Sequence, residues 1–199
     1  MQVLTQTILQ RAASLPEGSP LVAKAFLELG SRAAIDQSLS RLAKRGQLLR
    51  VSRGIYVRPI EGRFGQRSPE PAKVIEAFAA QAGETVVPSG AVEANVLGLT
   101  TQVPVREVYL TSGHSRSLKF GKQVVELRHA PKWQLALPGR PAGRALRAMA
   151  WAGERGVHAV ASYLEGKLPK SELRALVNTR YGKQPTWMAR ELNALAIHV

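Results

Sequence analysis

Apolar residues recur at helical spacing in the first part of the chain, and they predict helices separated by short breaks. The stripe over residues 3–14 predicts a first helix. Two prolines and a glycine within residues 14–20 interrupt this pattern. Residues 21–22 then predict a short strand, and residues 23–29 predict a short helix. So brief a helix is typical of the leading half of a helix-turn-helix.

A second amphipathic helix is predicted directly after this one. Gly30 is expected to end the short helix, because glycine adopts a left-handed C-cap at little cost. Ser31 is a good N-cap for the next helix, since its hydroxyl can accept a hydrogen bond from a free backbone N–H. Ile35, Leu39 and Leu42 then follow at helical spacing and predict the buried face.

Two short runs that alternate with period two predict a β-hairpin after the helix. Gly54 can supply the left-handed residue of a three-residue loop, with Arg53 at its exposed tip. Alternation directs one set of residues toward the core: Leu49, Val51, Ile55 and Val57. The opposite face is then expected to carry Arg50, Tyr56 and Arg58. Helix, helix and hairpin in this order predict a winged helix-turn-helix.

The predicted fold class is α+β, with a winged helix-turn-helix over residues 1–60, a linker over residues 61–71, and an α+β domain over residues 72–199. In the second domain, Pro71 suits the first turn of a helix that Gly83 ends. Further elements, including a helix capped by Ser89 and a hairpin with its turn at Gly121 and Lys122, are predicted over residues 85–87, 90–97, 105–111, 117–120 and 123–128.

Helical patterns return toward the end of the chain. They cover residues 142–151, 156–164 and 186–197, and Ser171 is expected to cap one more helix. In the first of these helices the pattern places Leu146 and Met149 inward and Arg144 and Arg147 outward. The three tryptophans are expected in the core: Trp133, Trp151 and Trp187. These helices either cover the sheet of the second domain or mediate dimerisation, which winged regulators often need to span two half-sites.

The charge balance changes this picture, because 28 Lys and Arg stand against 14 Asp and Glu, for a net charge of +14. A surplus of this size predicts a polyanionic partner: a nucleic acid, an acidic protein or an anionic membrane surface. The sequence contains no apolar run of the roughly 18 residues that a membrane span needs. The first residues also lack the pattern of a signal peptide. The absence of cysteine excludes disulfides and thiol chemistry and is compatible with the cytoplasm.

The basic residues concentrate on the predicted helix and hairpin. Residues 41–58 contain six Lys and Arg and no acidic residue. Arginine and glutamine read base edges, whereas serine and lysine mainly hold phosphates. The predicted DNA-binding residues are Ser31, Arg32, Ala33, Gln37, Ser40, Arg41, Lys44, Arg50, Arg53 and Arg58. Alternatively, each element alone is a solvated helix face or a basic hairpin that keeps a sheet edge soluble; together they favour duplex DNA.

A second basic region surrounds the hairpin of the second domain. Besides two histidines, it comprises Arg116, Lys119, Lys122, Arg128 and Lys132, with Glu126 as its acidic residue. This region is either a second surface for a nucleic acid or another anionic partner, or a solvated face of the sheet.

The chemistry of an enzyme is not expected in this chain. Asp36 is its single aspartate and lies on the predicted recognition helix, whereas two-metal phosphoryl chemistry needs several convergent carboxylates. The four histidines lack zinc-type spacing, and phosphate-binding glycine motifs and a nucleophile elbow are absent. We therefore predict a protein that is not an enzyme and that uses no cofactor or metal.

Two blocks of the sequence carry a resemblance to a known family. Residues 30–59 read GSRAAIDQSLSRLAKRGQLLRVSRGIYVRP and resemble the N-terminal domain of the AbiEi-type antitoxin family of type IV toxin–antitoxin systems. Residues 86–113 read VVPSGAVEANVLGLTTQVPVREVYLTSG and resemble the C-terminal region of that family, most closely in its short members. Together the resemblance covers roughly residues 20–130.

The resemblance implies an autoregulating repressor. In that family the N-terminal domain represses its own operon, and the C-terminal domain counteracts a nucleotidyltransferase toxin without necessarily forming a stable complex. The partner implied is double-stranded operator DNA, usually an inverted repeat, bound by a monomer or homodimer. The matching exposed residues are Arg32, Gln37, Arg41 and Lys44 on the helix, and Arg50 and Arg53 on the hairpin. Two alternatives remain: a solitary winged-helix regulator, and a basic interaction module for RNA or an acidic protein.

Overall fold

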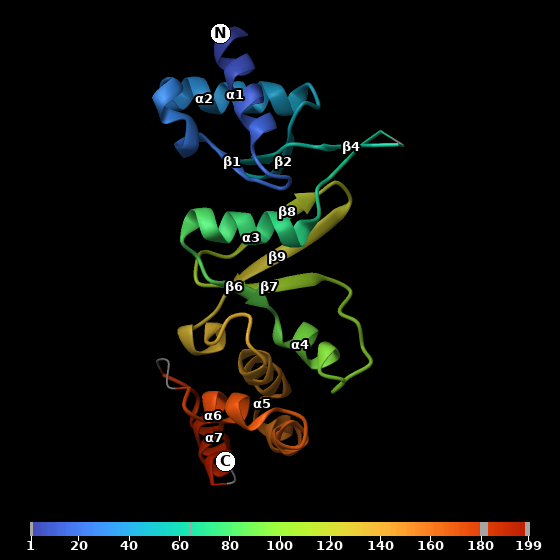
Figure 1. Ribbon diagram of the computed structural model, residues 1–199, viewed down its shortest axis with the longest axis vertical. Helices are drawn as coiled ribbons and strands as arrows, with labels where there is room; N and C mark the ends of the chain where they lie inside the picture. Colours follow the sequence, from blue (N-terminus) through green and yellow to red (C-terminus); the bar gives the residue numbers. More distant parts are fainter. Residues whose placement is uncertain (1, 64, 180–182, 198–199) are drawn as a thin grey trace. The chain divides into compact units, whose positions relative to one another are not determined.

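The computed structural model describes residues 2–63, 65–179 and 183–197, and it confirms an α+β fold (Figure 1). The chain forms two compact units. The first unit comprises residues 1–83 with 117–125, and the second comprises residues 84–116 with 126–199. Among the helices of these described residues, none is long and apolar enough to cross a membrane.

The first unit begins with the predicted alternation of helices and short strands. In chain order its elements are α1 (Gln2–Ser14), β1 (Leu21–Val22), the 3₁₀ helix η1 (Ala23–Leu29), α2 (Arg32–Lys44), β2 (Leu49–Ser52) and β3 (Ile55–Val57). The three strands form one antiparallel sheet in the order β1-β3-β2. This element order is the one predicted for a winged helix-turn-helix.

The apolar spacing of α1 and α2 builds the core beneath these elements. Ile8 of α1, Phe26 of η1 and the predicted stripe of α2, represented by Ile35 and Leu39, are all fully buried in one cluster. The cap of α2 is also confirmed, because Ser31 Oγ accepts a hydrogen bond from the Ala34 N–H at 3.3 Å. Helix α2 packs against η1 through this cluster, so its polar face points outward.

The predicted left-handed C-cap at Gly30 is wrong. Gly30 has φ 159° and ψ −174°, which is a nearly extended backbone. The physical reason is that η1 is a 3₁₀ helix, and the chain leaves it in an extended conformation to reach the Ser31 cap rather than through a left-handed turn.

The hairpin confirms most of the predicted alternation, with two corrections. The predicted three-residue loop is wrong, because Ser52 pairs with Ile55 and only Arg53 and Gly54 lie between the strands. Gly54 adopts φ 72°, as the loop requires, and Val51, Ile55 and Val57 are buried. Tyr56 was predicted to share the solvent face with Arg50, but it is only 4% exposed and belongs to the helical core cluster. It pairs with Leu21 of β1, so this face of β3 lies on the core as well.

The stretch predicted as a linker contains regular structure. Strands β4 (Ile60–Gly62) and β5 (Gly65–Arg67) form a two-stranded antiparallel hairpin there. Helix α3 (Pro71–Ala82) follows, with Pro71 in its first turn and Gly83 in the left-handed conformation at its end, as predicted. Its apolar stripe is buried throughout: Val74, Ile75, Phe78 and Ala79.

The second sheet has four strands in the order β6-β7-β9-β8. Its strands and the short helices beside them are β6 (Val86–Pro88), α4 (Gly90–Val96), β7 (Glu107–Thr111), β8 (Arg116–Phe120), β9 (Gln123–His129) and η2 (Lys132–Leu135). Ser89 occupies the N-cap position of α4, and Gly121 adopts φ 63° between β8 and β9. The predicted hairpin turn is therefore in place.

Three helices complete the second unit: α5 (Pro141–Glu165), α6 (Lys170–Val177) and α7 (Thr186–Ala196). The two helices predicted over residues 142–164 are the two halves of α5, which join at a kink where Gly153 has φ 68° and ψ −177°. The predicted cap at Ser171 is wrong, because Pro169 holds the N-cap position and Ser171 lies inside α6. The three helices share a buried apolar cluster that includes Leu146, Met149 and Leu176.

The face predicted for α5 needs two corrections. Arg147 was expected to point outward, but its side chain is 1% exposed. Trp151, expected in the core, is 47% exposed, whereas Trp133 is buried and Trp187 is partly buried, as expected. Arg147 points inward because it forms a buried ion pair with Glu93 of α4. The helical pattern within α5 alone does not reveal this partner.

Candidate nucleic-acid interface

The structure brings part of the predicted DNA-binding set together around one hollow, which we call the α2–hairpin hollow. It has a volume of about 510 Å³, and it lies entirely within the first unit. Its lining residues come from the polar face of α2 and from the β2–β3 hairpin: Arg32, Asp36, Ser40, Arg50, Arg53, Gly54 and Tyr56. Among these described residues, three are arginines and one is acidic, so the hollow carries a surplus of positive charge.

On the helix side, Arg32 and Asp36 are one turn apart and form an exposed ion pair. Arg32 Nε donates to Asp36 Oδ2 at 3.0 Å, and the side chains are 65% and 46% exposed. Exposed pairs at this helical spacing contribute only about 0.3–0.5 kcal/mol. The pair therefore orients the guanidinium without binding it tightly, and a stronger anionic partner can replace the carboxylate.

On the hairpin side, Arg50 is held against the core through Tyr56. Its guanidinium lies 6.0 Å from the centroid of the Tyr56 ring, which is at the outer limit for a cation–π interaction. Arg50 Nε also donates to the Ser52 carbonyl oxygen at 3.4 Å. Arg53 follows in the turn and is exposed. The buried tyrosine thus gives Arg50 a defined direction, whereas Arg53 is an exposed turn residue.

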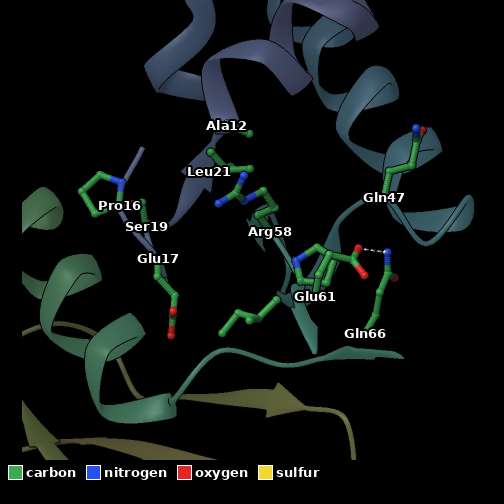
Figure 2. Close-up of a pocket in the computed structure, with 12 residues that line it drawn as sticks. Ala12, Pro16, Glu17, Ser19, Leu21, Gln47, Arg58, Glu61 and Gln66 are labelled. Carbon is green, nitrogen blue, oxygen red and sulfur yellow. Dashed lines mark hydrogen bonds between the residues drawn. The ribbon is translucent and has the colours of Figure 1, made fainter. Parts of the chain in front are cut away.

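The other predicted residues lie elsewhere on the first unit. Arg41 donates to Gln37 Oε1 at 3.1 Å and lines a separate hollow with Arg45. Arg58 lines a third hollow of about 400 Å³ together with Leu21 (Figure 2). Ser31, Ala33 and Lys44 are exposed on α2, and the Ser31 hydroxyl already serves the helix cap.

Three residues that line the α2–hairpin hollow are not in the predicted set: Asp36, Gly54 and Tyr56. Gly54 was predicted only as the left-handed residue of the hairpin loop. Asp36 was recognised on the polar face of the helix but was given no role in binding. Tyr56 could have been included, because period-two alternation predicts that it shares a face of the sheet with Arg50, and both residues line the hollow.

Comparison with known proteins gives a family but no activity. Residues 7–172 match a family described as a family of unknown function, DUF6088. The chain belongs to this family. Among curated proteins and among solved structures, none matches it. The family description assigns no activity, so support for a DNA-binding role comes from the geometry of the α2–hairpin hollow.

The second predicted basic surface differs from the α2–hairpin hollow, because two of its arginines are bound to carboxylates. Arg128 donates to Glu126 Oε2 through Nη2 at 2.7 Å and Nε at 3.0 Å, and Arg106 donates to Glu126 Oε1 at 3.1 Å. These hydrogen bonds, first from Arg128 and then from Arg106, hold the pKa of Glu126 below its usual value. Arg116 is paired with Glu84 and is only 21% exposed. The exposed lysines are Lys119, Lys122 and Lys132.

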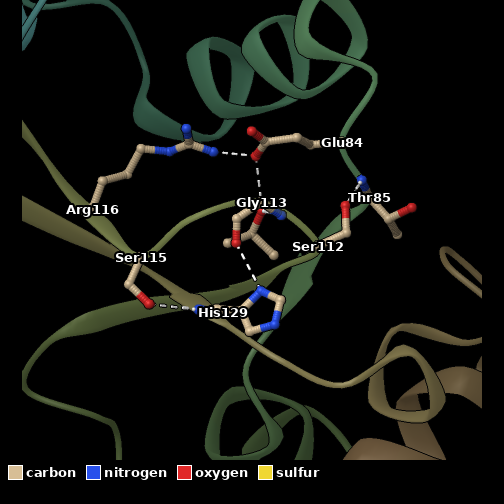
Figure 3. Close-up of polar contacts among 8 residues, drawn as sticks. Glu84, Thr85, Ser112, Gly113, Ser115, Arg116 and His129 are labelled. Carbon is tan, nitrogen blue, oxygen red and sulfur yellow. Dashed lines mark hydrogen bonds and ion pairs between the residues drawn. The ribbon is translucent and has the colours of Figure 1, made fainter.

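The Arg116 pair belongs to a polar network around the turn between β7 and β8 (Figure 3). Thr111 Oγ1 donates to Glu84 Oε2 at 2.9 Å, and His129 Nδ1 lies 2.8 Å from the Gly113 carbonyl oxygen. A Cβ atom at Gly113 would clash with the Glu84 carboxylate, so a larger residue there would displace that side chain from its bonds to Thr111 and Arg116. Contacts of this kind fix a turn. Within the described residues, no cluster of His, Asp or Glu is suited to hold a metal ion.

Proposed function

We propose that this protein is a sequence-specific, double-stranded-DNA-binding repressor whose N-terminal unit acts as a winged helix-turn-helix. In this proposal α2 is the recognition helix in the major groove, and the β2–β3 hairpin is the wing. The observation that carries the proposal is the α2–hairpin hollow, where arginines from both elements are exposed around one shared concavity. A helix and a basic hairpin that converge in this way are suited to a groove and its flanking phosphates.

The positions of the arginines suggest different roles. Arg32 lies in the first turn of α2, the part of a recognition helix that meets base edges, and it is suited to bidentate contact with guanine. Arg53, at the exposed hairpin turn, is suited to a phosphate, which fixes position without reading sequence. Arg50 lines the same hollow, and its guanidinium lies 6.0 Å from the centroid of the Tyr56 ring.

We further propose that the protein is the autoregulating antitoxin of a type IV toxin–antitoxin system and counteracts a nucleotidyltransferase toxin. This part rests on the resemblance of residues 30–59 and 86–113 to the AbiEi-type family. Coexpression with a nucleotidyltransferase encoded beside the gene tests it, because an antitoxin restores growth. A protein that binds its operator but leaves the toxicity unchanged is a solitary regulator instead.

The DNA part is tested by fluorescence anisotropy with the protein's own upstream DNA and a scrambled duplex, both at physiological salt. We expect a preference of ~1,000-fold or more for the upstream DNA. The matched pair of variants is Arg32→Ala and Arg155→Ala, since both remove one exposed arginine but Arg155 lies in α5 of the second unit. Equal binding of both duplexes contradicts specific readout and directs attention to RNA or an acidic protein as the partner.

A further inference from the structure

The second unit contains a hollow that the proposed DNA contacts do not use. It has a volume of about 330 Å³ and lies between α4, β7, β9 and α5, and we call it the α4–α5 pocket. Val108, Leu110 and Trp151 contribute apolar surface to it, and Arg106 and Arg128 contribute positive charge. This size and this mixture of an apolar lining with a few polar groups are typical of small-molecule sites.

A buried ion pair joins α4 and α5, the two helices that line the pocket. Glu93 Oε1 accepts hydrogen bonds from Arg147 Nη2 at 2.9 Å and from Arg147 Nε at 3.2 Å, with both side chains at most 3% exposed. The helices also approach closely at Gly90, where a Cβ atom would lie 2.3 Å from the Arg147 carbonyl oxygen and 2.7 Å from Trp151 Cβ. This contact sets the backbone that carries Trp151.

Trp151 and the two arginines provide the recognition chemistry. The indole is 47% exposed where a core residue was expected, and it lines the pocket. A large exposed aromatic side chain in a concave site offers a stacking surface to a flat ligand. Arg106 and Arg128 are 76% and 58% exposed and share the single carboxylate of Glu126. Two guanidinium groups on one carboxylate leave one positive charge for a second anion.

From these observations we infer that the α4–α5 pocket binds a small organic anion, with a flat apolar body against Trp151 and a carboxylate or phosphate at Arg106 and Arg128. The site lies wholly within the second unit and does not depend on the proposed DNA binding. The anionic group of the ligand would balance the positive charge that remains when Arg106 and Arg128 share the single carboxylate of Glu126.

The test follows the indole N–H signal of Trp151 by two-dimensional NMR, with Trp133 and Trp187 as internal references. The probes are phenylacetate and phenyl phosphate, each compared with a neutral counterpart, phenylacetamide and phenol. We expect both anions to move the Trp151 signal with a Kd at or below ~1 mM, and the neutral compounds to bind at least ~10-fold more weakly. Tighter binding of phenyl phosphate than of phenylacetate identifies the anion as a phosphate, and the reverse identifies a carboxylate.

Two variants separate a charge-specific site from a general effect. Arg106→Gln is expected to weaken the anions ~10-fold to the level of the neutral probes, because it removes one of the two guanidinium groups. Arg155→Gln, an exposed arginine of the same unit that does not line the pocket, is expected to leave the Kd unchanged. Both positions are exposed, so the fold tolerates the changes.

Three results would overturn the inference. The first is equal binding of anions and neutral probes, and the second is equal Kd values for the Arg106→Gln and Arg155→Gln variants. The third is a Trp151 signal that stays in place up to ~10 mM of every small probe, which lies above the weakest expected Kd. If a synthetic acidic peptide with apolar residues then moves the signal, the pocket is part of a protein interface instead.

Discussion

Two unequal parts of the chain carry equal net charge but differ in how their arginines are paired. Residues 1–67 contain 11 basic and 4 acidic residues, and residues 68–199 contain 17 and 10, so each part has a net charge of +7. In the α2–hairpin hollow, Arg32 has only an exposed carboxylate beside it. In the second unit, Arg116, Arg128 and Arg147 are held by Glu84, Glu126 and Glu93. Net charge alone predicts a polyanionic partner, whereas the pairing and exposure of single arginines distinguish the surfaces where the proposed DNA contact could form.

The strongest test of this comparison removes the partner of the buried arginine. Glu93→Ala leaves the Arg147 guanidinium buried without its carboxylate, and we expect a loss of about 3–5 kcal/mol in the free energy of unfolding. Burial already lowers the pKa of Arg147, but arginine stays charged, so the cost is not relieved by deprotonation. Urea unfolding followed by circular dichroism measures the loss.

The matched control for that measurement is Glu154→Ala. Glu154 is 64% exposed and lies 3.9 Å from Arg190, so its removal should change stability by less than about 0.5 kcal/mol. If the Glu93 and Glu154 variants lose similar amounts, the contrast between paired and exposed charge in this molecule is wrong.

A second, smaller loss is expected from Gly90→Ala. The added Cβ atom would lie 2.3 Å from a backbone carbonyl oxygen of α5, so one of the helices has to move. Overpacking of this kind typically costs about 1–3 kcal/mol. Gly166→Ala is the control, because its nearest new contact is 3.8 Å and its φ of −80° suits any residue. Thermal unfolding of the two variants should differ, and equal melting temperatures would show that α4 and α5 are not tightly joined at Gly90.

The comparison also explains how far the sequence alone predicts this structure. Helix α3 was predicted closely, because its buried stripe, its N-terminal proline and its final glycine are all local features. Arg147 was misplaced because its partner Glu93 lies 54 positions earlier in the chain. An apolar periodicity assigns polar residues outward, and it cannot represent a buried charge that is satisfied by a distant element.

The candidate site shows the same limit. The exposed side chains of α2 followed from its amphipathic spacing, but the hollow depends on how the hairpin lies against the helix. Alternation placed Arg50 of β2 and Tyr56 of β3 on the same face of the sheet. Tyr56 nevertheless pairs with the buried Leu21 of β1, so its side chain lies in the core. Arg50 and Arg58, predicted on one face, line different hollows of the first unit, and the local pattern does not reveal this.

On the DNA side, Arg32→Ala and Arg53→Ala should weaken binding in different ways if the proposed function is right. Arg32→Ala is expected to cost about 1–3 kcal/mol on the upstream DNA and to relax preference at one base pair. Arg53→Ala is expected to weaken all duplexes evenly and to reduce the slope of log K against log salt by about 1. Anisotropy titrations across a panel of single-base variants and salt concentrations distinguish these outcomes. Identical behaviour of the two variants contradicts separate roles for the helix and the hairpin.

The smallest expected effect concerns a paired carboxylate of the second unit at low pH. The side chain of Arg140 at 2.8 Å and the backbone N–H of Ala142 at 2.9 Å hold the pKa of Glu172 below its ordinary value of 4.5. A carboxylate with a lowered pKa stabilises the fold above its unfolded pKa, and this contribution is lost as the pH falls through the folded pKa.

Glu172→Gln should therefore lower the melting temperature near neutral pH, and the difference from the natural protein should shrink below about pH 4.5. Glu154→Gln is the matched control for the substitution itself, because this carboxylate is exposed and lies 3.9 Å from Arg190. A gap for Glu172→Gln that stays constant from neutral to acid pH would mean that the glutamate acts through its shape rather than its charge.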